Sequence, residues 1–140
     1  ETERYPIGKA HIARAGSRIT IIAYGAMMRP VLEAADDLQT HHDINAEVID
    51  LVSISPMDTP ALTESVSKTG RAVVVHEGPR NCGVAAEVIA RINETAFAYL
   101  EAPVKRVTGY DIHFPYFQTE RFYMPDAESI VAAVLETVAY

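Results

Sequence analysis

The sequence is poor in cysteine, in long apolar runs and in positive charge. Its one cysteine, Cys82, excludes an internal disulfide framework, which fits a reducing compartment. No stretch of 18 or more apolar residues occurs, so the sequence predicts no membrane-spanning helix. Only 12 Lys and Arg stand against 19 Asp and Glu, giving a formal net charge of −7. An acidic surface repels phosphate groups, so nucleic acid and anionic membranes are excluded as expected partners, whereas a basic protein partner stays open.

The common catalytic signatures are absent as well. Neither G-x-G-x-x-G nor G-x-x-x-x-G-K-[ST] occurs, so the sequence carries no dinucleotide fingerprint and no P-loop. A G-x-S-x-G nucleophile elbow is missing too. C-x-x-C and H-E-x-x-H do not occur, and a lone cysteine with scattered histidines argues against a structural zinc site. The sequence therefore predicts no metal site.

What the sequence does contain is an alternation of strand-like and helix-like segments in a length that suits one domain. Apolar, β-branched runs predict strands at 19–24, 46–51, 72–75 and 103–108, and helical spacing predicts helices after Gly25, Pro60, Gly83 and Asp126. This pattern predicts an α/β fold with a mostly parallel sheet and helices on both faces. The run before Arg14 predicts a hairpin with the strand at 19–24, which adds an antiparallel edge strand. Residues 1–9 are interpreted as an extended lead-in from a missing upstream domain, and residues 10–140 as the domain itself.

In such a sheet, ligands bind beyond the carboxyl ends of the strands, so the loops starting at Gly25, Val52, His76 and Gly109 are the candidate sites. His76 and Glu77 follow a buried strand and form the strongest candidate acid–base pair. The structural alternative is that His76 packs at the end of the sheet and Glu77 accepts backbone hydrogen bonds from the following loop.

Other reactive residue types are weaker candidates. Cys82 precedes a helix start, where a thiol pKa can fall, but no paired base is evident. Arg80 beside the same helix start could bind an anion, and His41-His42 could bind a metal, although solvated side chains explain both. An aromatic run is expected to pack on its own domain or a neighbouring one: Phe114, Tyr116, Phe117, Phe122 and Tyr123.

Several blocks of the sequence, in order, resemble one known module. They are Tyr5-Pro6-Ile7-Gly8-Lys9-Ala10, the segments 19–25, 48–58 and 70–77, Gly83-Val84-Ala85-Ala86-Glu87-Val88, Ala102-Pro103-Val104-Lys105-Arg106-Val107-Thr108-Gly109-Tyr110-Asp111, and Phe114-Pro115-Tyr116. Together they are similar to the C-terminal, transketolase-like domain of the β subunit of thiamin-diphosphate-dependent 2-oxo acid dehydrogenases. His76-Glu77-Gly78-Pro79 resembles the branched-chain enzymes more than the pyruvate enzymes.

The resemblance implies a three-layer α/β/α domain with a mixed five-stranded sheet. It also implies an α2β2 heterotetramer in which thiamin diphosphate and magnesium sit outside this domain, so that this domain alone binds neither. The whole enzyme would decarboxylate a 2-oxo acid and acylate the lipoyl group of an acyltransferase. The expected location is the cytoplasm, or the mitochondrial matrix in a eukaryote.

The resemblance also implies a docking role. The domain contacts the α subunit and a second β subunit, and it binds the small basic subunit-binding domain of the acyltransferase. By position, Glu101 would pair with basic residues of that partner, and Tyr140 at the end of the chain would take part. Without the resemblance, two alternatives stay open: a free-standing flavodoxin-like module that binds a small molecule, or an independent enzyme that uses His76 and Glu77.

Overall fold

The computed structural model describes residues 5–116 and 118–140, so residues 1–4 of the expected lead-in and Phe117 of the aromatic run lie outside the described residues. The described residues form β1 (His11–Arg14), β2 (Ile19–Ala23), α1 (Met28–His42), β3 (Ala46–Asp50), α2 (Thr59–Thr69), β4 (Ala72–Pro79), α3 (Val84–Ala96), β5 (Lys105–Gly109) and α4 (Ala127–Val138). Short 3-10 turns are η1 (Gly25–Met27), η2 (Phe97–Tyr99) and η3 (Glu120–Phe122).

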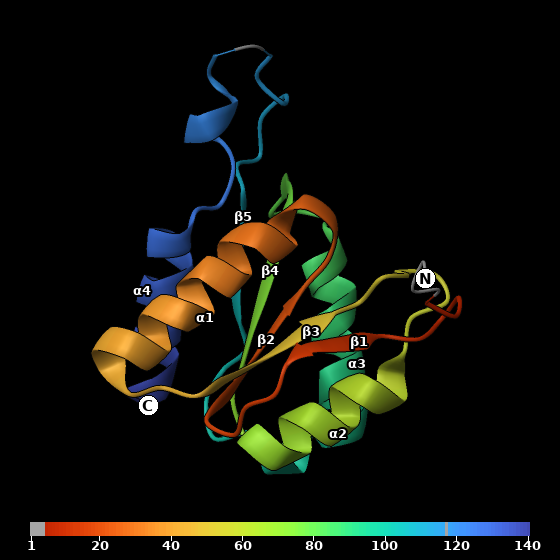
Figure 1. The fold of residues 1–140 in the computed structure, drawn as a ribbon. Coiled ribbons are helices and arrows are strands. Elements are labelled where there is room, and N and C mark those ends of the chain that lie inside the picture. Colours follow the sequence, from red (N-terminus) through yellow and green to blue (C-terminus); the bar gives the residue numbers. More distant parts are fainter. Residues whose placement is uncertain (1–4, 117) are drawn as a thin grey trace.

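The strands of the described residues form one five-stranded sheet in the order β1-β3-β2-β4-β5. The pairings of β2 with β3, β2 with β4 and β4 with β5 are parallel, and β1 is antiparallel at one edge. Helices α1 and α4 pack together on one face, and α2 and α3 pack together on the other (Figure 1). The predicted three-layer α/β/α fold with a mixed, mostly parallel sheet is confirmed.

One prediction about the sheet is wrong. β1 is an antiparallel edge strand, but it pairs with β3 and does not form a hairpin with β2. The connection between β1 and β2 crosses the start of β3, where the backbone N–H groups of Ser17 and Arg18 donate to the carbonyl of Asn45 at 3.1 and 2.9 Å. These hydrogen bonds place β2 on the far side of β3. The composition of the two runs carries no information about this crossing.

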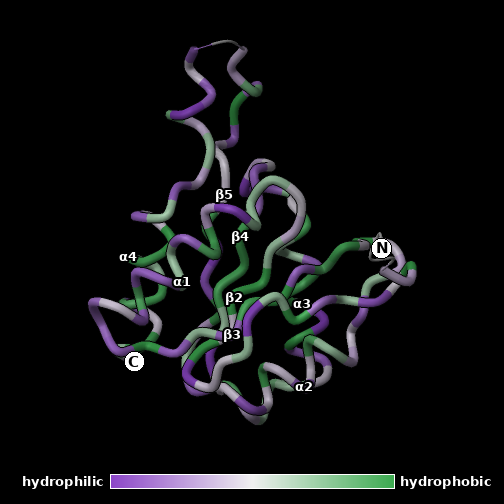
Figure 2. Tube along the Cα trace, viewed as in Figure 1, coloured by the Kyte–Doolittle hydropathy of each residue, from purple (hydrophilic) through white to green (hydrophobic). Residues whose placement is uncertain are grey.

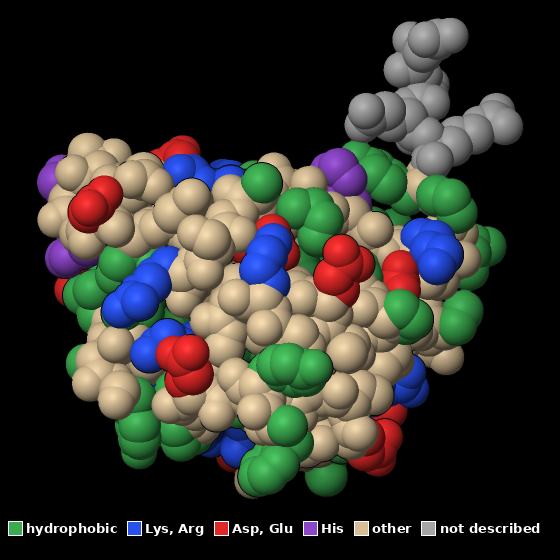
Figure 3. Space-filling view, turned by 90° about the horizontal axis from the view of Figure 1, so that it is seen from below, with side chains coloured by type: hydrophobic (Ala, Val, Ile, Leu, Met, Phe, Trp, Pro, Cys, Tyr) green, Lys and Arg blue, Asp and Glu red, His purple; other side chains and the backbone are tan. Residues whose placement is uncertain are grey.

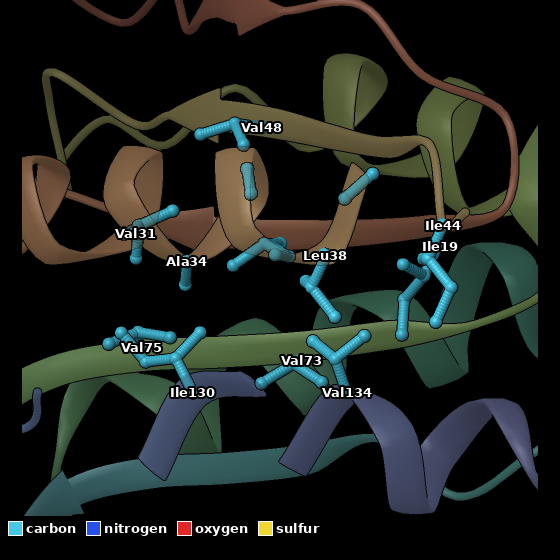
Figure 4. Close-up of a cluster of buried hydrophobic side chains, with 14 of the residues drawn as sticks. Ile19, Val31, Ala34, Leu38, Ile44, Val48, Val73, Val75, Ile130 and Val134 are labelled. Carbon is cyan, nitrogen blue, oxygen red and sulfur yellow. The ribbon is translucent and has the colours of Figure 1, made fainter. Parts of the chain in front are cut away.

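Side chains alternate across β2, and this alternation divides the core into two layers. Ile19 and Ile21 point toward α1 and α4, whereas Ile22 points toward α2 and α3. Figure 4 shows the first layer, in which Val31 and Leu38 of α1 face Ile130 and Val134 of α4, with strand residues among them. Figure 2 shows the hydrophobic colour concentrated along the central strands. Burial on both faces explains why β2 and the first four residues of β4, Ala72–Val75, are almost wholly apolar.

The two ends of the parallel strands have different surroundings. At the carboxyl ends, residues 110–116 and 118–123 lie in an arm that projects from the domain (Figure 1). Tyr123 is buried there and makes an edge contact with Phe114 at 5.1 Å between ring centroids, but Tyr116 and Phe122 are exposed. The amino-terminal ends of β4 and β5 lie at the opposite end of the molecule, beside the chain's C-terminus. This second end contains the candidate site.

Candidate partner-binding site

A cleft of about 550 Å³ lies where α3 ends, β5 begins and the chain terminates. Both residues that the resemblance singled out, Glu101 and Tyr140, line it. The remaining lining residues come from α3 and from the segment that joins it to β5: Ile89, Asn93, Phe97, Leu100, Ala102, Pro103 and Val104. The fold therefore brings together two residues that are 39 positions apart in sequence.

Two contacts hold Glu101 in place. The backbone N–H of Glu101 donates to the carbonyl of Gly70 at 2.8 Å, and the Glu101 side chain forms an ion pair with Arg71. The Arg71 side chain is only 13% exposed, whereas that of Glu101 is 59% exposed. Glu101 is therefore anchored on one side and still presents carboxylate oxygen to solvent. A carboxylate fixed in this way can accept hydrogen bonds from a second cation without losing much side-chain entropy.

Exposed aromatic side chains lie near this carboxylate: Phe97 and Tyr140 line the same cleft, and Tyr99 precedes Glu101 by two residues. Phe97 is 71% exposed, Tyr99 57% and Tyr140 74%. Figure 3 views the molecule from below and shows exposed hydrophobic side chains among acidic and basic ones. Large aromatic rings are typical of the core of protein interfaces and are costly to leave in water. Sequence reasoning missed Phe97 and Tyr99, although two aromatics directly after the last apolar position of a helix were a usable signal.

An anchored carboxylate beside exposed aromatic rings suits a partner surface that is both basic and partly apolar. The rings supply buried area, and the carboxylate supplies the charge that selects a cation. Among the described residues, no helix is both long enough and apolar enough to span a membrane.

His76 and Glu77 lie at the other end of the sheet, and their surroundings differ: His76 is buried and Glu77 is exposed. The His76 ring is 1% exposed and stacks against Tyr24, with 6.5 Å between ring centroids. Burial and the nearby Arg106 guanidinium lower the pKa of His76, although the backbone of Gly78 opposes this shift. Neither ring nitrogen makes a hydrogen bond of ordinary geometry among the described residues. Glu77 is exposed. The pKa of Tyr24 is raised mainly by burial of Tyr24 and further by the negative charge of Glu77. Their acid–base role stays a prediction.

The weaker candidates are placed as follows. Cys82 is exposed in the loop before α3. Arg80 donates to the backbone carbonyl of Arg106 at 3.3 Å, and His41 bonds Asp37 at 2.7 Å on the surface of α1. Among residues 5–116 and 118–140, no group of three or more His, Cys, Asp or Glu side chains could hold a metal ion.

Comparison with known proteins adds independent information. The model of the family described as "Transketolase, C-terminal domain" matches residues 8–130. The β subunit of mitochondrial 2-oxoisovalerate dehydrogenase from Dictyostelium discoideum is 45% identical over 135 residues, which cover 96% of this chain and 36% of that protein. The β subunit of the pyruvate dehydrogenase E1 component from Bacillus subtilis is 42% identical over 140 residues, covering 99% of this chain and 43% of that protein.

Among solved structures, a split gene transketolase, described as an inactive beta4 tetramer, superposes with a TM-score of 0.84 at 31% identity. The match covers 98% of this chain and 43% of that one. The chain thus spans about two fifths of the length of the curated relatives named above. Both branched-chain and pyruvate enzymes are among its relatives at similar identity, so the closer resemblance to the branched-chain enzymes stays a prediction.

Proposed function

Because this chain belongs to the family of transketolase C-terminal domains, we propose that it is the assembly and docking domain of the β subunit of a 2-oxo acid dehydrogenase. In this role it contacts an α subunit and a second β subunit, and its Glu101 cleft binds the basic subunit-binding domain of a dihydrolipoyl acyltransferase. The whole enzyme would decarboxylate a 2-oxo acid and acylate a lipoyl group. It would work in the cytoplasm, or in the mitochondrial matrix of a eukaryote.

The observation that carries this proposal is the shared cleft of Glu101 and Tyr140. A chain with formal net charge −7 attracts a basic partner, and the cleft offers that partner both a fixed carboxylate and aromatic area. The names of the relatives and the family match favour this function over a flavodoxin-like binding module.

The side chains described here do not fit the cofactors of such an enzyme. Thiamin diphosphate brings a magnesium ion, which takes carboxylate, carbonyl and phosphate oxygens as ligands. No cluster of candidate metal ligands exists among the described residues. We therefore assign cofactor binding to other parts of the enzyme and derive no catalytic step from this chain.

A titration of this chain with a purified subunit-binding domain tests the docking role. Isothermal calorimetry at low and at high salt should give a complex that weakens as salt rises, because surface charges are screened. Glu101→Lys should weaken the complex at low salt by at least about tenfold, since it reverses a contacting charge. Tyr140→Ala and Phe97→Ala should each weaken it at both salt concentrations, because they remove apolar area.

Glu33→Lys is the matched control. It makes the same charge change at an exposed position of α1, on the opposite face of the sheet. Equal affinities for Glu101→Lys and Glu33→Lys would reject the Glu101 cleft as the docking site. No binding by the folded unsubstituted chain would reject the docking role itself.

A further inference from the structure

The strand order of the sheet singles out one place for a ligand. After β2, the chain adds β3 on one side of that strand and β4 on the other, so its direction across the sheet reverses between β2 and β4. Open α/β sheets bind ligands beyond the carboxyl ends of their strands at such a reversal. Tyr24 directly follows β2 there, and the ring of His76 in β4 stacks against it with 6.5 Å between ring centroids. The buried histidine therefore lies at the reversal.

His76 has hydrogen-bonding capacity that the described residues do not use. The residue is 1% exposed, and neither Nδ1 nor Nε2 makes a hydrogen bond of ordinary geometry among residues 5–116 and 118–140. Native proteins rarely leave buried polar groups in this way, because each one costs free energy until it finds a partner. A Cβ added at Gly78 would lie 3.3 Å from Nδ1, and one added at Gly83 would lie 2.9 Å from Nε2. The ring is thus enclosed by two glycines, and Nε2 is on the side of Gly83.

Gly83 is the N-cap of α3, and this helix also begins with unused donors. The first N–H groups of a helix have no partner within the helix. Glycine has no side chain that could accept them, and the start of this 13-residue helix has no side-chain cap. The helix dipole adds positive potential at the same end. Two independent features, an uncapped helix start and an unpartnered buried imidazole, therefore meet at Gly83.

Two arginines make this region cationic, although the whole chain carries a formal net charge of −7. Arg106 is close enough to His76 to lower its pKa, after the larger effect of burial. Nη1 of Arg80 donates to the carbonyl of Arg106 at 3.3 Å, and Nη1 of Arg106 donates to the carbonyl of Arg80 at 3.2 Å. A guanidinium has five N–H donors, so both side chains keep donors for a ligand. Asp111, a carboxylate beside these arginines, accepts the backbone N–H of Asn81 at 2.7 Å.

The surroundings also provide access. A cleft of about 900 Å³ is lined by Arg80, Arg106 and Thr108, and it reaches the first turn of α3 at Ala86. The loop that joins β4 to α3 is exposed over residues 79–82. Within it Cys82 has φ +55°, a left-handed conformation that residues other than glycine disfavour. A small shift of this exposed loop is therefore enough to open a path from the cleft to the imidazole.

We propose that the start of α3 binds a phosphate group, which accepts hydrogen bonds from the first N–H groups of the helix, from Nε2 of His76 and from the guanidinium groups of Arg80 and Arg106. Helix N-termini suit phosphate because their N–H groups and their dipole are directed at the anion. A neutral imidazole can carry its proton on Nε2 and donate it to a phosphate oxygen. The phosphate group belongs either to inorganic phosphate or to a small phosphorylated molecule. The site does not involve the Glu101 cleft and is independent of the docking role.

A titration of the ¹⁵N-labelled chain with inorganic phosphate, at constant ionic strength, tests the proposal by NMR. We expect saturable shifts of the amide signals of Val84 and Ala85 and of the ring nitrogen signals of His76, whereas potassium chloride should cause none. His76→Leu should weaken phosphate binding at least about tenfold, because it removes a hydrogen bond to a charged group. His42→Leu is the matched control at an exposed position of α1 and should leave binding unchanged.

Val84→Pro is a second variant that tests the helix start without altering the imidazole. Proline removes the N–H of the first helical residue, and its fixed φ suits that position. Gly83 already has the extended conformation that a residue before proline requires, with φ −82° and ψ 162°. We expect this variant to keep the melting temperature of the unsubstituted chain within a few degrees and to bind phosphate more weakly.

The absence of a saturable shift in the unsubstituted chain would overturn the proposal. Unchanged phosphate affinity in folded His76→Leu or in Val84→Pro would also overturn it. Glycerol 3-phosphate identifies the source of the phosphate group. Tighter binding than inorganic phosphate would support the site and assign it to a phosphorylated molecule, whereas equal or weaker binding would support it and assign it to free phosphate.

Discussion

Arg71 and Glu101 form an ion pair between two segments that lead into neighbouring parallel strands. Arg71 immediately precedes β4, and Glu101 lies four residues before β5. The Glu101 backbone also donates to Gly70. The position of the Glu101 carboxylate is thus tied to the register of the sheet, and a change at the end of α2 should reach the proposed docking surface.

Gly70→Ala should lower both stability and partner affinity. Gly70 has φ +69°, and an added Cβ would lie 2.9 Å from the carboxyl carbon of Glu101. Alanine in this left-handed conformation costs on the order of 1 kcal/mol or more. Because the carboxylate must move as well, we expect weaker binding of the basic domain in the calorimetric titration.

Gly25→Ala separates the two effects. Gly25 has φ +60°, but an added Cβ there would meet nothing within 4 Å. It should therefore cost a similar amount of stability in urea unfolding and leave partner affinity unchanged. If Gly70→Ala binds the partner as tightly as Gly25→Ala does, the geometry of Glu101 is not important for docking.

A buried polar network at the start of β2 provides a second prediction. The Thr20 hydroxyl is 2.7 Å from that of Ser65 and 2.8 Å from that of Thr69, and Ser65 donates to Glu47 at 2.6 Å. Thr20→Val keeps the shape but leaves buried hydroxyls without this partner, which should cost about 1–3 kcal/mol. Thr40→Val removes an exposed hydroxyl bonded to Asp36 and should change stability much less in the same urea unfolding experiment. Equal losses would show that the network does not stabilise the fold.

The same network predicts a loss of stability in acid. Burial tends to raise the pKa of Glu47, but hydrogen bonds from Lys68, Ser65 and the Gly16 backbone outweigh burial and hold it below its usual 4.5. The contribution of a carboxylate with a lowered pKa is complete above its unfolded pKa and is lost as the pH falls through the folded value. Unfolding measured from pH 6 to pH 3 should show a smaller acid-induced decline in Glu47→Gln. An unchanged decline would exclude Glu47 as its source.

The sequence predicted the layers of this fold better than its connections. Four-residue and longer apolar β-branched runs identify β2, β3 and β4 because those strands are buried on both faces. Asp126 marks the start of α4 through local capping chemistry, and the structure confirms this prediction, since its side chain accepts a hydrogen bond from the backbone N–H of Ser129. The pairing of β1 with β3 depends on a crossing that no local pattern encodes.

The candidate site, too, was only partly predictable from the sequence. The resemblance indicated Glu101 and Tyr140, but the sequence did not indicate that Phe97 lines the same cleft or that Tyr99, two residues before Glu101, is exposed. Their exposure depends on how α3 ends and on the backbone hydrogen bond from Leu100 to Phe97 that closes η2. Such surfaces arise from tertiary packing, whereas helix caps arise from residues three or four positions apart.

His76 provides the last prediction, a pH dependence near neutrality. Burial and Arg106 lower its folded pKa below the usual 6.5, while the unfolded chain binds a proton near that value. The unfolded state therefore gains protons first as the pH falls, so the stability due to neutral His76 is complete above pH 6.5 and declines below it. Urea unfolding between pH 8 and pH 5.5 should show this decline, and His76→Gln should flatten it. His42→Gln, at an exposed position, should leave it unchanged. If both variants retain the full slope, the ring at position 76 is not held neutral by its surroundings, and the stacked arrangement with Tyr24 does not control its protonation.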